Sequence, residues 1–234
     1  MKFAADDVHR DFFQKNKAIE FENVFSEEEV LLLKNEIAAS LSRRLSAAKE
    51  KIQGENVQKI FEVGRDLWRD SPSIRKLTLN RRLGELAFQL VGERPIRIGY
   101  DQYFPSMGKA SKLIKGRYET FLQTPSSLKE CSSLQGIACG LLIALKNRQD
   151  ASDPNEKFIF PSRQGNAVFL HPEAVIPWPK LLENKEKEYY LIVYASRTSI
   201  YVLNVKDPQS RFLMHEGYAA GDRLNDLKNP IIFR

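Results

Sequence analysis

The sequence predicts an α+β fold in which a helical N-terminal part is followed by strands that form a sandwich or jelly roll. Apolar residues recur at helical spacing in the first part of the chain, and from Pro95 onward their period changes from 3.6 to 2. Turn residues then separate short runs that are rich in Tyr, Val, Ile and Phe. We expect one domain spanning residues 1–234, with residues 1–93 mainly helical and residues 94–234 mainly β.

Residues 1–93 contain signals for the start of three helices. Ser26 can cap a long helix, because its side chain can accept from the Glu29 N–H while Glu29 reaches back to the cap. One apolar stripe follows, made of Val30, Leu33, Ile37, Leu41 and Leu45. Shorter helices are expected after Ser71-Pro72 and after Asn80, and Gly92 should end the second of them.

The second part predicts strands. Apolar and polar residues alternate over 96–104, as in a half-buried strand. Further strands are expected at Gly136–Leu145, Phe158–Phe160, Ala167–His171, Tyr189–Ala195 and Ser199–Val205. Arg197-Thr198, between the last two, predicts a tight hairpin.

Composition sets limits on partners and location. The net charge is +6, with a pI near 9.2, but the excess is spread along the chain. The locally basic stretch Lys109–Arg117 favours a solvated loop over a phosphate-binding patch, and without a recognisable binding motif we consider nucleic acid unlikely.

Cys131 and Cys139 predict two reduced thiols. Since neither a secretory signal nor 18 consecutive apolar residues occur, we expect a cytoplasmic protein without a membrane span.

Three segments together resemble the phytanoyl-CoA dioxygenase-like proteins. They are IEFENVFSEEEVLLLKNEI (Ile19–Ile37), the block Asp66–Phe104 that ends in a "DQ" strand, and GNAVFLHPEAVIPW (Gly165–Trp178). The resemblance implies a double-stranded β-helix, which is a cupin-like jelly roll, supported by N-terminal helices. Members of the family are iron(II) and 2-oxoglutarate-dependent oxygenases. Their iron is held by two histidines and a carboxylate, and an arginine binds 2-oxoglutarate.

The residues that this resemblance requires are absent from the matching positions. The stretch Arg117–Leu134 contains neither histidine nor aspartate, Ile176 stands where the second histidine is expected, and Lys187 lies near the position of the arginine. The resemblance therefore implies a noncatalytic binding or regulatory protein, a pseudoenzyme without metal or cofactor. By analogy its pocket would contain Tyr100, Gln102, Trp178 and Lys187, and its partner would be a small molecule or a protein segment.

An active oxygenase is the alternative hypothesis. His171 and Glu173 form a His-x-Glu pair, and His215 and then Arg223 follow in the order of an iron triad and its arginine. In a strand, residues 171 and 173 would point to the same face. These residues would then hold iron(II) and 2-oxoglutarate, although Pro172 indicates that the strand ends there.

Overall fold

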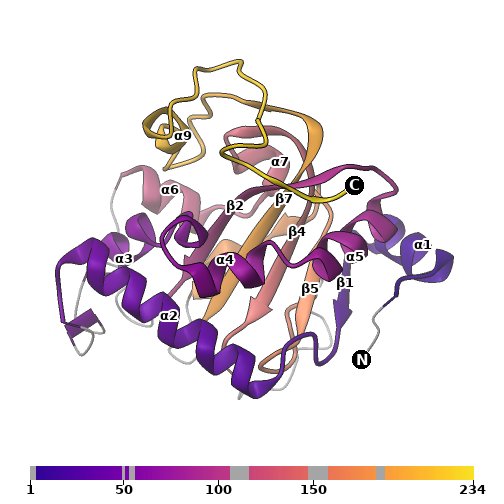
Figure 1. Ribbon diagram of the computed structural model, residues 1–234, viewed down its shortest axis with the longest axis horizontal. Coiled ribbons are helices and arrows are strands. Elements are labelled where there is room, and N and C mark those ends of the chain that lie inside the picture. The colour runs from indigo at the N-terminus through magenta and orange to yellow at the C-terminus, as the bar shows by residue number, and fades with distance from the viewer. Residues whose placement is uncertain (1–3, 49–50, 53–55, 106–115, 147–157, 183–187) are drawn as a thin grey trace.

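The centre of the molecule is an antiparallel sheet of six strands (Figure 1). The computed structural model describes residues 4–48, 51–52, 56–105, 116–146, 158–182 and 188–234. In spatial order the strands are β1 (Ala18–Phe21), β5 (Ala167–Leu170), β4 (Leu134–Ala144), β7 (Tyr189–Tyr201), β2 (Ile96–Phe104) and β8 (Ile231–Phe233). A second, two-stranded sheet pairs β3 (Ser126–Ser127) with β6 (Val175–Ile176).

Helices lie on both sides of the large sheet. The N-terminal group contains α1 (Asp7–Asn16), α2 (Glu27–Leu45), α3 (Val57–Val63), the 3-10 turn η2 (Leu67–Arg69), α4 (Pro72–Thr78) and α5 (Arg81–Val91). Figure 1 shows α2, α4 and α5 crossing one face of the sheet. The other group contains α6 (Arg117–Gln123), α7 (Leu128–Cys131), α8 (Trp178–Leu182) and α9 (Phe212–His215). The predicted α+β class is confirmed.

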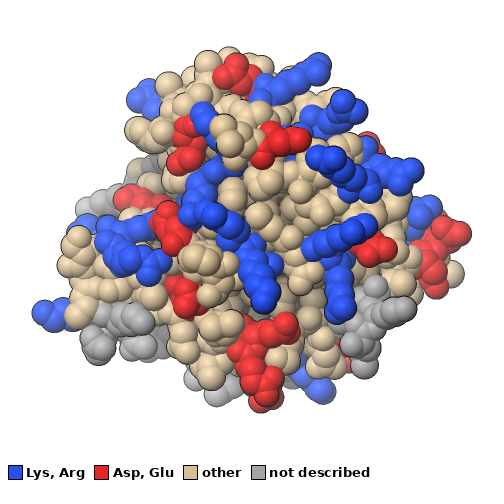
Figure 2. All heavy atoms as spheres, viewed as in Figure 1, with Lys and Arg blue, Asp and Glu red and all other residues tan. Residues whose placement is uncertain are grey.

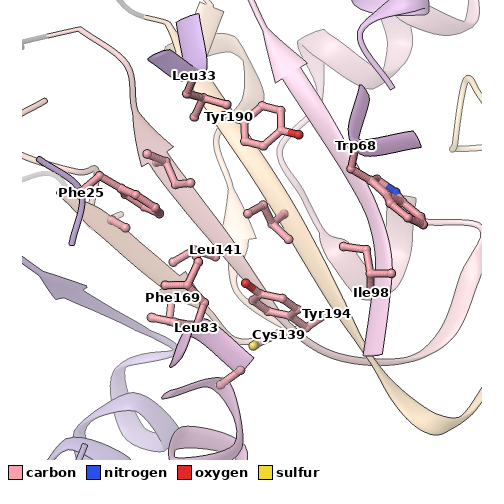
Figure 3. Close-up of a cluster of buried hydrophobic side chains, with 14 of the residues drawn as sticks. Phe25, Leu33, Trp68, Leu83, Ile98, Cys139, Leu141, Phe169, Tyr190 and Tyr194 are labelled. Atoms are coloured by element: carbon pink, nitrogen blue, oxygen red, sulfur yellow. The ribbon is translucent and has the colours of Figure 1, made fainter. Parts of the chain in front are cut away.

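Both faces of the large sheet are buried. Successive side chains of a strand point to opposite faces, so β7 supplies Tyr190, Ile192 and Tyr194 to the core under the N-terminal helices. Figure 3 shows Tyr190 and Tyr194 in this core together with Leu33, Trp68 and other buried side chains. The alternate residues, among them Leu191 and Val193, enter a second core inside the curled sheet. This two-sided burial explains why β7 reads as a nearly continuous apolar run.

The local helix signals are confirmed. Ser26 caps α2, and the reciprocal bond from the Ser26 N–H to Glu29 is present at 2.8 Å. Pro72 occupies the first turn of α4, whose cap is Ser71. Asn80 caps α5, and Gly92 ends that helix at a φ of 75°, a left-handed conformation that glycine adopts without strain.

Two strand predictions are wrong. Tyr189–Tyr201 is a single strand, so the expected hairpin at Arg197-Thr198 does not form. The cause is tertiary pairing, because β4 pairs with both ends of β7, from Ala144↔Tyr189 to Leu134↔Tyr201. Phe158–Phe160 forms no strand, although its rings pack beside the inner core. Strand β8 was not predicted. Of the helices that the structure describes, none combines the length and apolar character needed to cross a membrane.

Candidate ligand site

Three of the four residues expected in the pocket line one small cavity inside the curled sheet. Tyr100 and Gln102 come from β2, and Trp178 begins α8. Lys187 lies outside the described residues. The cavity is small, about 10 Å³, and has room for roughly one water molecule. Its other walls include Phe61, Arg65, Phe104, Phe121, Cys131 and Asp207.

Aromatic rings fill most of this interior. Trp178 is only 1% exposed, and its ring stacks on Phe104 with centroids 5.5 Å apart and planes 16° apart. Phe121 packs on the same indole at 4.9 Å, and Phe61 meets Phe104 edge-on at 5.4 Å. The indole Nε1–H donates to Ser126 Oγ at 2.9 Å, so the polar atom of the buried ring is satisfied.

A buried ion pair closes the same space. The Arg65 guanidinium lies 3.0 Å from Asp207 Oδ2 and 3.7 Å above the ring centre of Tyr100. The Ser133 N–H also donates to Asp207 Oδ2, at 3.0 Å. Burial opposes the charge on Arg65, but Asp207 outweighs it together with other neighbours, and the pKa of the guanidinium is raised. Arg65 is therefore a cation that the chain already neutralises.

The remaining polar groups of the interior are occupied by the chain itself. Gln102 Nε2 donates to the carbonyl oxygens of Phe61 at 2.9 Å and Tyr103 at 3.0 Å, while Gln209 donates to Gln102 Oε1 at 3.3 Å. Burial raises the pKa of the Cys131 thiol to about 12, so it stays protonated at neutral pH. This interior offers packing and internal hydrogen bonds, and little that a ligand could use.

The described residues of this interior do not fit iron or 2-oxoglutarate. Among the described residues, no three His, Cys, Asp or Glu side chains are grouped so that they could hold a metal ion. Ile176, at the position where the resemblance expects a histidine, is fully buried in the inner apolar core. The buried guanidinium of Arg65 already has Asp207 as its anion, and a cavity with room for about one water molecule does not admit a dicarboxylate.

His171 and Glu173 lie at the edge of the molecule near α1. The His171 N–H donates to the Lys17 carbonyl at 2.9 Å, and its ring lies 5.7 Å from that of Phe13. Partial burial, assisted by Lys17, lowers the pKa of His171. Glu173 forms ion pairs with Lys129 at 2.9 Å and with Lys17 at 3.6 Å. Both side chains thus have structural partners at this edge.

The structure does not bring the other two residues of the alternative site to this edge. His215 belongs to α9, which Figure 1 shows far from α1 and β5. Arg223 is exposed and forms an isolated bridge with Ile200 of β7. His171, Glu173 and His215 are all described, and they do not form a group that could hold a metal. The order of these residues along the chain matches an iron site, but their positions in the fold do not. His171 follows the end of β5 at Leu170, whereas His215 lies in α9.

A larger hollow opens beside the filled interior. It measures about 270 Å³ and shares Phe121 and Cys131 with the small cavity. Its other walls come from Thr124, Pro125, Ser126 and Glu130 and from the loop after β7, where Val205 is 88% exposed. Glu130 and Lys206 supply the charged groups. We call this space the mouth hollow. Apolar walls with a few polar groups are typical of small-molecule sites.

Sequence reasoning missed the ion pair of Arg65 and Asp207, and it missed a second buried polar cluster under the N-terminal helices. There, Asp101 Oδ1 accepts the Leu67 N–H at 2.8 Å and Oδ2 accepts the Trp68 N–H at 2.9 Å. Asp66 binds Arg69 Nε at 2.9 Å. Burial, followed by the neighbouring Asp66, raises the pKa of Asp101 to about 7. Asp101 is the one acid in β2, and it was the available signal.

Comparison with known proteins shows which solved structures this fold resembles. No protein-family model and no curated protein matches the sequence. Solved structures do match. The non-heme α-ketoglutarate-dependent carbocyclase SnoK from nogalamycin biosynthesis is 16% identical, with a TM-score of 0.62 over 97% of this chain and 96% of SnoK. The epimerase SnoN from the same biosynthesis is 16% identical, with a TM-score of 0.61 over 96% and 97%.

A third similar structure is EctD from S. alaskensis with 2-oxoglutarate and 5-hydroxyectoine. It is 14% identical, with a TM-score of 0.56 over 98% of this chain and 87% of EctD. At these identities the likeness concerns the fold, and fold alone does not establish activity. The expected double-stranded β-helix is confirmed: the chain has the cupin-like fold of iron and 2-oxoglutarate-dependent oxygenases.

Proposed function

We propose that this protein is a noncatalytic binding protein built on the oxygenase jelly roll, as a degenerate relative of the phytanoyl-CoA dioxygenase-like proteins. The observation that carries the proposal is the filled interior. An oxygenase of this kind needs three metal ligands on one side of the iron and open positions on the other. Here Trp178 and Phe104 stack inside the curled sheet, the cavity they line has room for about one water molecule, and Arg65 is neutralised by Asp207.

The proposed binding site is the mouth hollow. Phe121 and the exposed Val205 offer apolar contact, while Glu130 and Lys206 can fix the orientation of a ligand. A volume of about 270 Å³ suits a small molecule or one side chain of a partner segment. We further propose a cytoplasmic location, where Cys131 and Cys139, both free and buried, would remain reduced.

Metal analysis tests the noncatalytic part. Protein without a histidine tag is purified without chelators, its metal content is measured, and its melting temperature is recorded with manganese(II) and 2-oxoglutarate. We expect substoichiometric metal and an unchanged melting temperature. A cofactor present at 100 times its Kd would add about 2.7 kcal/mol and raise the melting temperature by roughly 5–11 °C. Stoichiometric metal with such a rise would refute the proposal.

A dye titration tests the mouth hollow separately. The probe is 1-anilinonaphthalene-8-sulfonate, whose fluorescence rises in apolar surroundings. We expect saturable binding that Val205→Asp weakens about tenfold. The matched control is Leu227→Asp, because Leu227 is also highly exposed, at 90%, but does not line the hollow. If Val205→Asp binds the dye like the wild type, or if both variants lose it equally, the hollow is not the site.

A further inference from the structure

A second hollow lies at the end of β2 opposite the filled interior. It measures about 550 Å³, and four arginines line it: Arg94, Arg97, Arg197 and Arg234. Among the described residues that line it, Asp226 is the one acid. We call this space the arginine hollow. It shares no lining residue with the mouth hollow or with the small cavity.

Strand pairing brings these residues together from distant parts of the chain. Arg97 of β2 lies opposite Ala195 of β7 on one side and opposite Ile231 of β8 on the other. Arg197 follows Ala195 by two residues, and Arg234 follows the end of β8. Figure 2 shows basic side chains gathered around the place where Figure 1 marks the C-terminus. The cluster is therefore a product of the sheet, not of a basic stretch of sequence.

The charges of the arginine hollow are not balanced within the described part of the chain. Asp226 is already bound to Arg97 at 3.0 Å, and Arg97 also donates to the Leu224 carbonyl at 2.7 Å. Arg97 is only 4% exposed, yet its buried Nε has no hydrogen-bond partner among described residues.

The other three arginines, Arg94, Arg197 and Arg234, are exposed and form no ion pair with a described residue. Like charges that share one concave space repel each other, and an anion in that space would remove the repulsion. Beyond Asp226, which is bound to Arg97, the described side chains that line the hollow therefore supply no counter-charge.

We propose that the arginine hollow binds the phosphate groups of a small polyanion. Guanidinium groups match phosphate oxygens in planar, two-point contacts, and such charge-assisted hydrogen bonds are stronger than neutral ones. Arg97 is the fixed, buried part of the site, held by Asp226. Arg94 comes from the segment just before β2, and Arg197 comes from β7. The volume exceeds what a single phosphate fills, so the site suits a diphosphate or a nucleotide phosphate chain.

Calorimetric titration with pyrophosphate, in buffer without other polyvalent anions, tests this proposal. We expect saturable binding that weakens as the salt concentration rises. The double variant Arg94→Gln with Arg197→Gln should bind at least tenfold more weakly, and both sites are exposed, so an unchanged melting temperature verifies folding. Arg163→Gln is the matched control, because Arg163 is exposed, has the same charge and lies outside the hollow.

A parallel titration with ATP separates the two sources of the phosphate. Equal affinity for pyrophosphate and ATP assigns the site to the phosphates alone, and tighter ATP binding that the double variant loses adds a contact to the nucleoside. The proposal is overturned if pyrophosphate does not saturate the protein at millimolar concentration. It is also overturned if Arg163→Gln weakens binding as much as the double variant, since that outcome indicates general charge attraction.

Discussion

Replacement of Trp178 by alanine measures how tightly the interior of the jelly roll is packed. A buried indole removes about 150–250 Å² from water, and Trp178 is 1% exposed, so nearly all of that area counts. At about 25 cal/mol per Å², the transfer term is roughly 4–6 kcal/mol. Substitutions of this kind cost about 3–5 kcal/mol in practice. We therefore expect Trp178→Ala to lower the free energy of unfolding by about 4 kcal/mol.

Urea unfolding followed by circular dichroism is the assay for this loss. In a separate thermal unfolding experiment, the same loss should lower the melting temperature by roughly 8–16 °C, given about 2–4 °C per kcal/mol for a chain of this size. Trp178→Phe is the control, because it keeps the ring stacked on Phe104 and loses the bond to Ser126 Oγ, for which about 1 kcal/mol is expected. Added indole should restore part of the stability of Trp178→Ala and leave the wild type unchanged.

One result would refute the reasoning. If Trp178→Ala unfolds within about 1 kcal/mol of the wild type, the indole is not a packed part of the core. The space would then be able to admit water or a ligand, and the argument for a filled interior would fail. Loss of stability with no response to indole would mean instead that the neighbours, Phe121 first among them, collapse into the vacated space.

Three further predictions concern buried charges and a helix cap. Asp207→Asn should lower the free energy of unfolding by about 3–5 kcal/mol, because Arg65 is left charged and buried, and adding Arg65→Met should recover much of that loss in the same urea assay. The pKa of Asp101, raised from its usual 3.8 to about 7, means that the folded state holds a proton that the unfolded chain has lost. Its contribution to stability therefore falls as the pH rises between these values, and Asp101→Asn should remove that component when unfolding is measured from pH 4 to pH 8. Ser26→Ala should cost about 1 kcal/mol, measured by urea unfolding, and a loss below a few tenths would mean that the capping box adds nothing.

Local chemistry made several elements readable from the sequence. Ser26, Ser71 and Asn80 each accept a hydrogen bond from a backbone N–H within three residues, so their effect does not depend on the rest of the fold. The same is true of Gly92, which takes a left-handed conformation at the end of α5. The position of the strand over 96–104 was equally predictable, because the change to an alternating pattern is a local property. The expected half-burial was wrong, since all residues of β2 except Tyr103 are buried.

Other features could be decided only by contacts between distant residues. The sequence at Arg197-Thr198 predicts a turn, yet β4 pairs with β7 on both sides of these residues. This pairing keeps β7 a single strand. Spacing also failed for His171 and His215, because the chain between them leaves the strand and places His215 in α9.

For the candidate site, the sequence predicted the scaffold and, by analogy, a pocket containing Tyr100, Gln102 and Trp178, which line the inner cavity. Only the tertiary structure decided what fills that cavity, because Arg65 and Asp207 are 142 positions apart and meet through the sheet. The arginine hollow has the same origin, since its residues come from β2 and the segment before it, from β7, and from β8 and the segments on either side of it. Periodicity and capping are local, whereas burial of a charge and its neutralisation depend on which distant side chain arrives beside it.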